Sequence, residues 1–163
     1  MVEDRARNRV AIVAFEARHA EAFRDLNVAW IERYFVVEDK DREVLEDPVG
    51  RILDKGGAIL IAEDSAAAAI GCVALVPVGE GVLELVKMAV TDNHQGQGVG
   101  RMLVDAAIAR ARDIGARTLY LESNSKLEPA VRLYERAGFE HLPAEERPHS
   151  PYERCNVYMR REL

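Results

Sequence analysis

The chain has 163 residues, of which 48% are hydrophobic and 31% are charged. This length and balance exclude a disordered chain and favour one domain over residues 1–163 with a sizeable core. The net charge of −6 argues against nucleic acid as a partner, because proteins that bind its backbone present a basic face. No apolar run reaches the roughly 20 residues that a bilayer span needs. We therefore expect a cytoplasmic protein with no membrane partner.

The first part of the chain predicts a strand over Arg9 to Phe15 and a long helix over Ala17 to Phe35. Large apolar side chains recur along that helix at helical spacing and should share its buried face: Phe23, Leu26, Trp30 and Tyr34. A shorter helix over Asp41 to Glu46 should end before Pro48, with one more turn over 49–55.

The rest of the chain predicts a mixed α/β fold. Three strand-like runs joined by short polar turns should form an antiparallel meander: Ala58 to Glu63, Ile70 to Val78 and Val82 to Val90. Helices and strands then alternate: a helix over Val99 to Ile114, a strand over Arg117 to Ser123, a helix over Glu128 to Ala137, a strand over Phe139 to Leu142 and a closing strand over Arg154 to Arg161. Residues 143–151 form a proline-rich loop before that last strand.

The cysteines and histidines do not indicate a metal site. Cys72 and Cys155 fall in apolar, strand-like segments and are far apart in the sequence, so we expect two buried, reduced thiols. The four histidines show no metal-ligand spacing either. The sequence therefore predicts no metal.

The segment Gln95-Gly96-Gln97-Gly98-Val99-Gly100 lies between a predicted strand and a predicted helix. Its glycines let the backbone approach a ligand closely. The first amides of a helix lack internal partners and carry the positive end of its dipole. Such a turn suits a phosphate or pyrophosphate, and the guanidinium of Arg101 could add a charged contact.

Other interpretations of this loop compete. A P-loop requires Lys followed by Ser or Thr, which the segment lacks. A dinucleotide fingerprint requires a third glycine where Arg101 stands, although Glu122 follows about 20 residues on, where a ribose-binding acid would lie. The structural alternative is a turn that merely needs glycine.

Gln95, Gly98 and Gly100 fit the pattern Q-x-x-G-x-G, and this stretch resembles the acyl-CoA loop of the GNAT superfamily of N-acetyltransferases. The closing segment Tyr152 to Met159 resembles that of small bacterial members. The strand over Glu84 to Val90 and the segment Leu133 to Phe139 also resemble that family, and the order of elements agrees over nearly the whole chain. The resemblance implies a GNAT-like fold with a splayed central sheet, and an N-acetyltransferase that uses acetyl-CoA as cosubstrate.

The resemblance also implies roles for individual residues. Glu84 matches the position of the base in several members, and Tyr134 matches a tyrosine that protonates the CoA thiolate. Transfer would be direct, in a ternary complex. Two groups would hold acetyl-CoA: Met88, Ala89 and Val90 at the acyl group and pantetheine, and Gly96, Gln97, Gly98, Val99, Gly100 and Arg101 at the pyrophosphate. Gln95, which opens the same loop, is also expected to contact the cofactor. The family's asparagine is replaced by Leu127, so Asn124 is the candidate for its contact with the CoA arm.

The acceptor stays open between an amino acid, a polyamine, an antibiotic, a peptide N-terminus and a lysine side chain. It should bind between the early helices and the 143–151 loop, near Trp30, Tyr34, Glu38, Asp39, Asp41 and Glu43. Glu122 and Glu63 are reserve bases. An acyl-CoA-binding regulatory module without turnover and a nicotinamide dinucleotide protein are the alternatives, and the sequence leaves a homodimer open.

Overall fold

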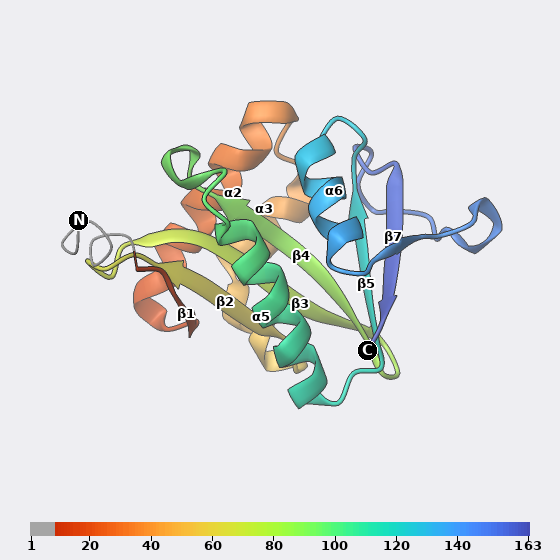
Figure 1. Cartoon of the computed structure of the whole chain (residues 1–163), viewed down its shortest axis with the longest axis horizontal. Coiled ribbons are helices and arrows are strands. Elements are labelled where there is room, and N and C mark those ends of the chain that lie inside the picture. The colour runs from red at the N-terminus through yellow and green to blue at the C-terminus, as the bar shows by residue number, and fades with distance from the viewer. Residues whose placement is uncertain (1–8) are drawn as a thin grey trace.

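A computed structural model describes residues 9–163 and shows a seven-stranded mixed sheet with helices on both faces (Figure 1). The strands are β1 Ala11–Ala14, β2 Ala58–Glu63, β3 Ala69–Gly79, β4 Val82–Val90, β5 Thr118–Ser123, β6 Glu140–His141 and β7 Val157–Glu162. The α-helices are α2 Ala20–Tyr34, α3 Asp39–Glu46, α4 Pro48–Arg51, α5 Val99–Ile114 and α6 Glu128–Arg136. Short 3₁₀ turns cover Ala17–His19, Leu53–Lys55, Asp92–His94 and Ala144–Glu146. The mixed α/β fold predicted from the sequence is confirmed.

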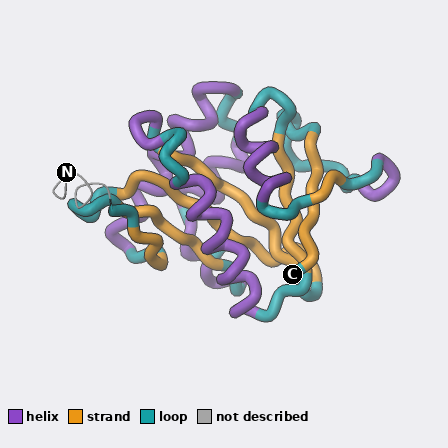
Figure 2. The backbone as a smooth tube through the Cα atoms, viewed as in Figure 1, coloured by secondary structure: helices purple, strands orange, loops and turns teal. Residues whose placement is uncertain are grey.

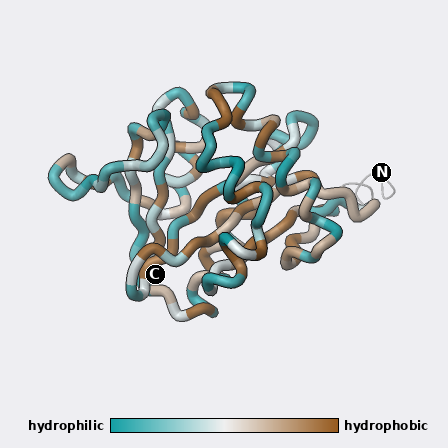
Figure 3. Tube along the Cα trace, turned by 180° about the vertical axis from the view of Figure 1, so that it is seen from behind, coloured by the Kyte–Doolittle hydropathy of each residue, from teal (hydrophilic) through white to brown (hydrophobic). Residues whose placement is uncertain are grey.

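The sheet lies between two helical layers, with α5 and α6 on one face and α2, α3 and α4 on the other (Figure 2). Its strand order is β1-β2-β3-β4-β5-β7-β6, and the predicted meander is β2, β3 and β4. The apolar residues concentrate along these strands (Figure 3). Two cores result, one between the sheet and α5 with α6, the other between the sheet and α2 with α3.

The central strands separate partway along their length. β4 and β5 are the parallel pair, and they pair only where Val82 to Glu84 faces Thr118 to Tyr120. β4 then continues to Val90 and β5 to Ser123 without pairing to each other in the part of the chain that is described. The predicted splay is therefore present, and it begins next to Glu84.

A β-bulge in β4 shapes the wall of this opening. The register between β3 and β4 shifts midway, and Lys87 there has a φ of 55°, which is uncommon for a residue other than glycine. A bulge changes which face successive side chains occupy. Leu85 lies in the core under α5 and Val86 in the core under α2, whereas beyond the bulge Met88 takes the α5 side and Ala89 the α2 side.

The buried face of α2 differs from the predicted one. Phe23, Asn27 and Ile31 are buried four residues apart, whereas Tyr34 is 36% exposed. The Asn27 side-chain amide donates to Phe23 O at 2.9 Å and to Cys72 Sγ at 3.3 Å, so this polar group is satisfied inside the core. The predicted buried face was wrong in part, because the spacing of apolar residues does not reveal a buried asparagine.

The closing strand also starts later than predicted. β7 begins at Val157, because the preceding residues cross the end of β5, where Asn156 N–H donates to Ser123 O at 2.9 Å. Cys155 therefore lies in a half-buried loop and not in a strand, while Cys72 is buried as predicted; both are free thiols. Over residues 9–163, no helix is both long and apolar enough to cross a membrane.

Candidate active site

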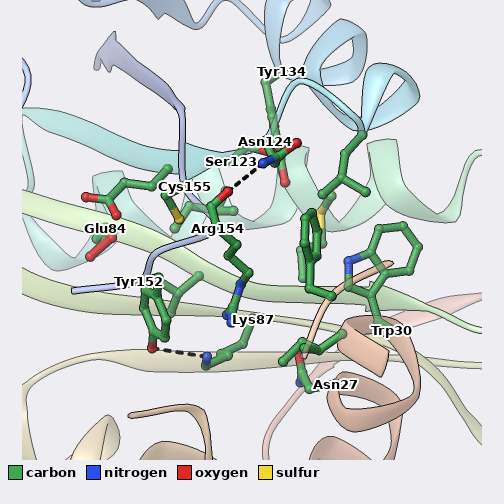
Figure 4. A pocket seen from close by; sticks show the side chains of 17 residues that line it. Asn27, Trp30, Glu84, Lys87, Ser123, Asn124, Tyr134, Tyr152, Arg154 and Cys155 are labelled. Carbon is green, nitrogen blue, oxygen red and sulfur yellow. Dashed lines mark hydrogen bonds between the residues drawn. The ribbon is translucent and has the colours of Figure 1, made fainter. Parts of the chain in front are cut away.

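A cavity of about 130 Å³ opens where β4 and β5 separate (Figure 4). Its walls come from α2, β4, β5, α6 and the loop that precedes β7. Charged and aromatic side chains line it, among them Trp30, Glu84, Lys87, Glu122, Tyr134, Tyr152 and Arg154. A cavity with converging titratable groups is the usual form of an active site.

Glu84 lies on β4 at the last residue paired with β5, opposite Tyr120. Burial raises the pKa of Glu84 from an ordinary value of 4.5 to about 7, and the nearby carboxylate of Glu122 adds to the rise. The Lys87 ammonium lowers this pKa slightly, but its Nζ bonds to Asp41. Glu84 is thus a carboxyl group that can take up and release a proton near neutral pH.

Tyr134 reaches the cavity from α6 (Figure 4). Its side chain is buried, with the ring packed edge-on against Phe139 at 5.9 Å between centroids. Burial raises the pKa of the Tyr134 phenol above its ordinary value. The phenol therefore keeps its proton, and among the described residues no group hydrogen-bonds to its hydroxyl, which leaves the O–H available to a group inside the cavity.

Asp41 corrects one prediction. The sequence placed it among the acidic residues near the acceptor, yet its side chain is fully buried and bonded to two cations. Lys87 Nζ lies 2.6 Å and an Arg154 guanidinium nitrogen 2.7 Å from Asp41 Oδ1. Burial alone would raise the pKa of Asp41, but Arg154 and Lys87 hold it at about 2. The one sequence signal was the spacing of Glu38 and Asp41, which form a capping box at the start of α3.

Sequence reasoning missed the basic wall of the cavity. The Arg154 guanidinium stacks on the Tyr152 ring at 4.4 Å and also bonds Glu38 at 2.9 Å. Lys87 Nζ donates to the Tyr152 hydroxyl at 3.3 Å (Figure 4). Tertiary contacts bring these residues together, so no local motif predicts the cluster.

The glycine-rich loop is open to solvent. Gly96 and Gly98 have φ values of 77° and 81°, a region that favours glycine. No atom lies within 4 Å of where a Cβ would stand at either position. The ladder of α5 starts with Met102 N–H donating to Gly98 O at 3.0 Å, so the amides of residues 98–101 have no acceptor within the helix. This is the geometry of an anion-binding turn.

The longer side chains of this loop form hydrogen bonds and an ion pair within the protein. Gln95 Nε2 lies 3.3 Å from both Val90 O and Asp92 Oδ1. Gln97 Nε2 donates to Asn93 O at 3.2 Å. The Arg101 guanidinium pairs with Asp105 at 3.0 Å on the exposed face of α5. The backbone amides are therefore the groups left to meet an anion.

The remaining predicted residues lie around the cavity in different ways. Met88 lines it, whereas Ala89 is buried in the core and Val90 lines a separate hollow beside α2. Asn124 lines the cavity, but its amide donates to Arg154 O at 2.6 Å and accepts from Lys126 N–H at 2.8 Å. Its side chain thus holds the cavity wall together. Within residues 9–163 no group of three metal-ligating side chains is found.

Comparisons with known proteins identify the family and the fold of the chain. Residues 20–139 match the model of the acetyltransferase (GNAT) family. An uncharacterized N-acetyltransferase of Schizosaccharomyces pombe is 33% identical over 120 residues, which are 73% of this chain and 72% of that protein. A GNAT-family acetyltransferase from Staphylococcus aureus has the same fold, with a TM-score of 0.86 and 19% identity over 95% of this chain and 99% of the other. An acetyltransferase from Salmonella typhimurium, solved with its cofactor acetyl-CoA, has a TM-score of 0.74 and 19% identity over 95% of this chain and 94% of the other.

Proposed function

Since the chain belongs to the GNAT family and is an acetyl-CoA-dependent acyltransferase, we propose that it moves an acetyl group to a primary amine by direct attack in a ternary complex. The observation that carries this proposal is the cavity between β4 and β5, which Glu84 and Tyr134 both line. We also propose a cytoplasmic location for the protein.

Acetyl-CoA would bind along the open edge of β4. Its pyrophosphate would meet the unpaired amides at the start of α5, where the helix dipole favours negative charge. Its pantetheine arm would extend into the gap beside Met88 and Val90, and a backbone amide of this stretch would hold the oxyanion of the tetrahedral intermediate. The absence of side chains at Gly96 and Gly98 supports this path, because it leaves room for the phosphates.

Glu84 would remove a proton from the acceptor. An alkyl amine has a pKa of about 10.4 and carries an extra proton at neutral pH, so it must lose that proton before its lone pair can attack. A carboxyl group with a pKa of about 7 is ionised in part at this pH and can accept the proton. The neutral amine then attacks the thioester carbonyl.

Tyr134 would supply the proton to the leaving group. When the carbon–sulfur bond breaks, the CoA thiolate needs a proton, and the buried phenol holds one. A covalent acetyl-cysteine route is disfavoured, because burial raises the pKa of the Cys155 thiol to about 11 and that of Cys72 to about 12. Such thiols are poor nucleophiles at neutral pH.

Thiol release from acetyl-CoA with a panel of primary amines tests this function. We expect Glu84→Gln and Tyr134→Phe each to lower kcat by about 100-fold or more, the usual contribution of one acid or base, with little change in CoA affinity. Glu140→Gln, which changes an exposed side chain on β6, is the matched control. Tight CoA binding with no amine-dependent thiol release would instead indicate a regulatory module, and binding of a nicotinamide dinucleotide in place of CoA would refute both.

A further inference from the structure

Glu122 is a carboxylate in the cavity that the proposed reaction does not use. It lies on β5 two residues after Tyr120, so the two side chains share a face of the sheet. Tyr120 is the β5 partner of Glu84 in the parallel pair, and both Glu84 and Glu122 line the cavity. Two carboxyl groups thus converge from neighbouring strands at the point where these strands separate.

Hydrogen bonds fix Glu122 in place. The Tyr120 hydroxyl donates to Glu122 Oε2 at 2.7 Å, and the Ser150 hydroxyl donates to Oε1 at 2.5 Å. Tyr152 N–H donates in turn to the Ser150 oxygen at 3.0 Å, which sets the loop against the strand. Each carboxylate oxygen therefore accepts a hydroxyl hydrogen bond, and the two bonds hold the carboxyl group in one orientation.

The surroundings of Glu84 differ. Among the described residues no hydrogen bond reaches its carboxyl group, and neither Glu84 nor Glu122 forms an ion pair with a lysine or arginine. The cations of the cavity, Lys87 and Arg154, are bonded to Asp41. The cavity thus presents two acidic groups that lack a cationic partner, one oriented by hydroxyl donors and the other desolvated.

We propose that Glu122 binds the ammonium group of the acceptor and presents it to Glu84, an assignment that rests on the proposed function of this cavity. The acceptor enters as a primary ammonium ion, whose N–H groups contact the Glu122 carboxylate. One proton passes from the nitrogen to the ionised Glu84, which becomes a neutral acid while Glu122 keeps its charge. The amine, now neutral, has a lone pair for the thioester carbon.

The unequal surroundings of the two carboxyl groups explain why Glu122 would bind the ammonium group and Glu84 would accept the proton. Two carboxyl groups close together take different roles when their environments separate their affinities for a proton. Burial and the charge of Glu122 together raise the pKa of Glu84. A bound ammonium ion offsets that charge, so Glu84 ionises more readily when the acceptor is present. The cavity therefore selects a cationic acceptor over a neutral one of the same shape.

A carboxyl NMR titration tests the proposal without requiring turnover. In Glu122→Gln we expect the pKa of Glu84 to fall toward its ordinary value, and n-butylammonium to bind the CoA complex at least about 10-fold more weakly, since a hydrogen bond to a charged group is lost. Glu145→Gln, in the exposed part of the same loop, should change neither property. Unchanged CoA affinity in calorimetry would show that the variant folds correctly.

The variant Ser150→Ala tests the orientation of the Glu122 carboxylate separately from its charge. It keeps the charge of Glu122, so Glu84 should titrate as in the wild type, while amine affinity falls less than in Glu122→Gln. The proposal is overturned if Glu84 titrates identically with and without Glu122, or if n-butylammonium binds both proteins equally. Absence of thiol release with every amine in the wild type would refute the proposed function, whereas the titration would still decide whether Glu122 holds a cation beside Glu84.

Discussion

At the scale of single residues, the raised pKa of Glu84 lowers the stability of the folded protein. Its folded-state pKa of about 7 lies above the ordinary 4.5, so the folded protein resists ionising a carboxyl group that the unfolded chain ionises freely. The sign follows from proton linkage: stability falls as the pH rises from about 4.5 to 7 and does not recover above that. The proposed role of Glu84 as a base depends on this raised pKa.

We therefore predict that Glu84→Gln stabilises the protein at pH 8 by up to about 3 kcal/mol, relative to its effect at pH 5, while it abolishes most activity. Urea unfolding at both pH values measures this difference. Glu140→Gln, on exposed β6, should show no such dependence on pH. An equal effect of Glu84→Gln at both pH values would mean that this carboxyl group titrates normally.

At the scale of elements, the turn into α5 forms the proposed phosphate site. Two of its residues, Gly96 and Gly98, have positive φ values, and their missing side chains leave open space. The turn, the start of the helix and the end of β4 together bring unpaired amides to one place. Another glycine, Gly115, ends the same helix with a φ of 97° and also has open space around it.

These two helix ends give a matched pair of variants. Gly98→Ala and Gly115→Ala should each destabilise the protein by about 1 kcal/mol, because alanine is strained at positive φ. Only Gly98→Ala should weaken CoA binding, by about 10-fold or more, since its methyl group projects where the phosphates approach. Calorimetric titration with CoA distinguishes them, and equal affinities for the two variants would rule out this turn as the phosphate site.

At the scale of the whole molecule, Asp41 joins distant parts of the chain. Through its two cations it connects α3 to the bulge in β4 and to the loop before β7. Its folded-state pKa of about 2 lies below the ordinary 3.8, so its contribution to stability is present above pH 3.8 and is lost as the pH falls through about 2. The cavity wall formed by Lys87 and Arg154 depends on this buried cluster.

Replacing this one carboxylate should therefore loosen the fold. We predict that Asp41→Asn lowers the free energy of unfolding at pH 7 by about 3–5 kcal/mol, because Lys87 and Arg154 keep buried charges without a full counterion. Asp39→Asn is the control on the same helix, since Asp39 forms an exposed pair with Arg42 and should change stability by less than about 1 kcal/mol. Similar values for both variants would contradict a structural role for Asp41.

The sequence by itself determined the order of elements, the meander, the glycine-rich turn and its family resemblance, and it nominated Glu84 and Tyr134. Each of these depends on residues close together in the chain: apolar periodicity, turn chemistry and helix starts. The tertiary structure alone decided the ion pairs that bury Asp41, the convergence of Glu122 on Glu84, and the return of the last loop over the cavity. The physical reason is distance along the chain: Arg154 and Asp41 stand 113 residues apart in sequence yet bond at 2.7 Å, and no local pattern encodes such a contact.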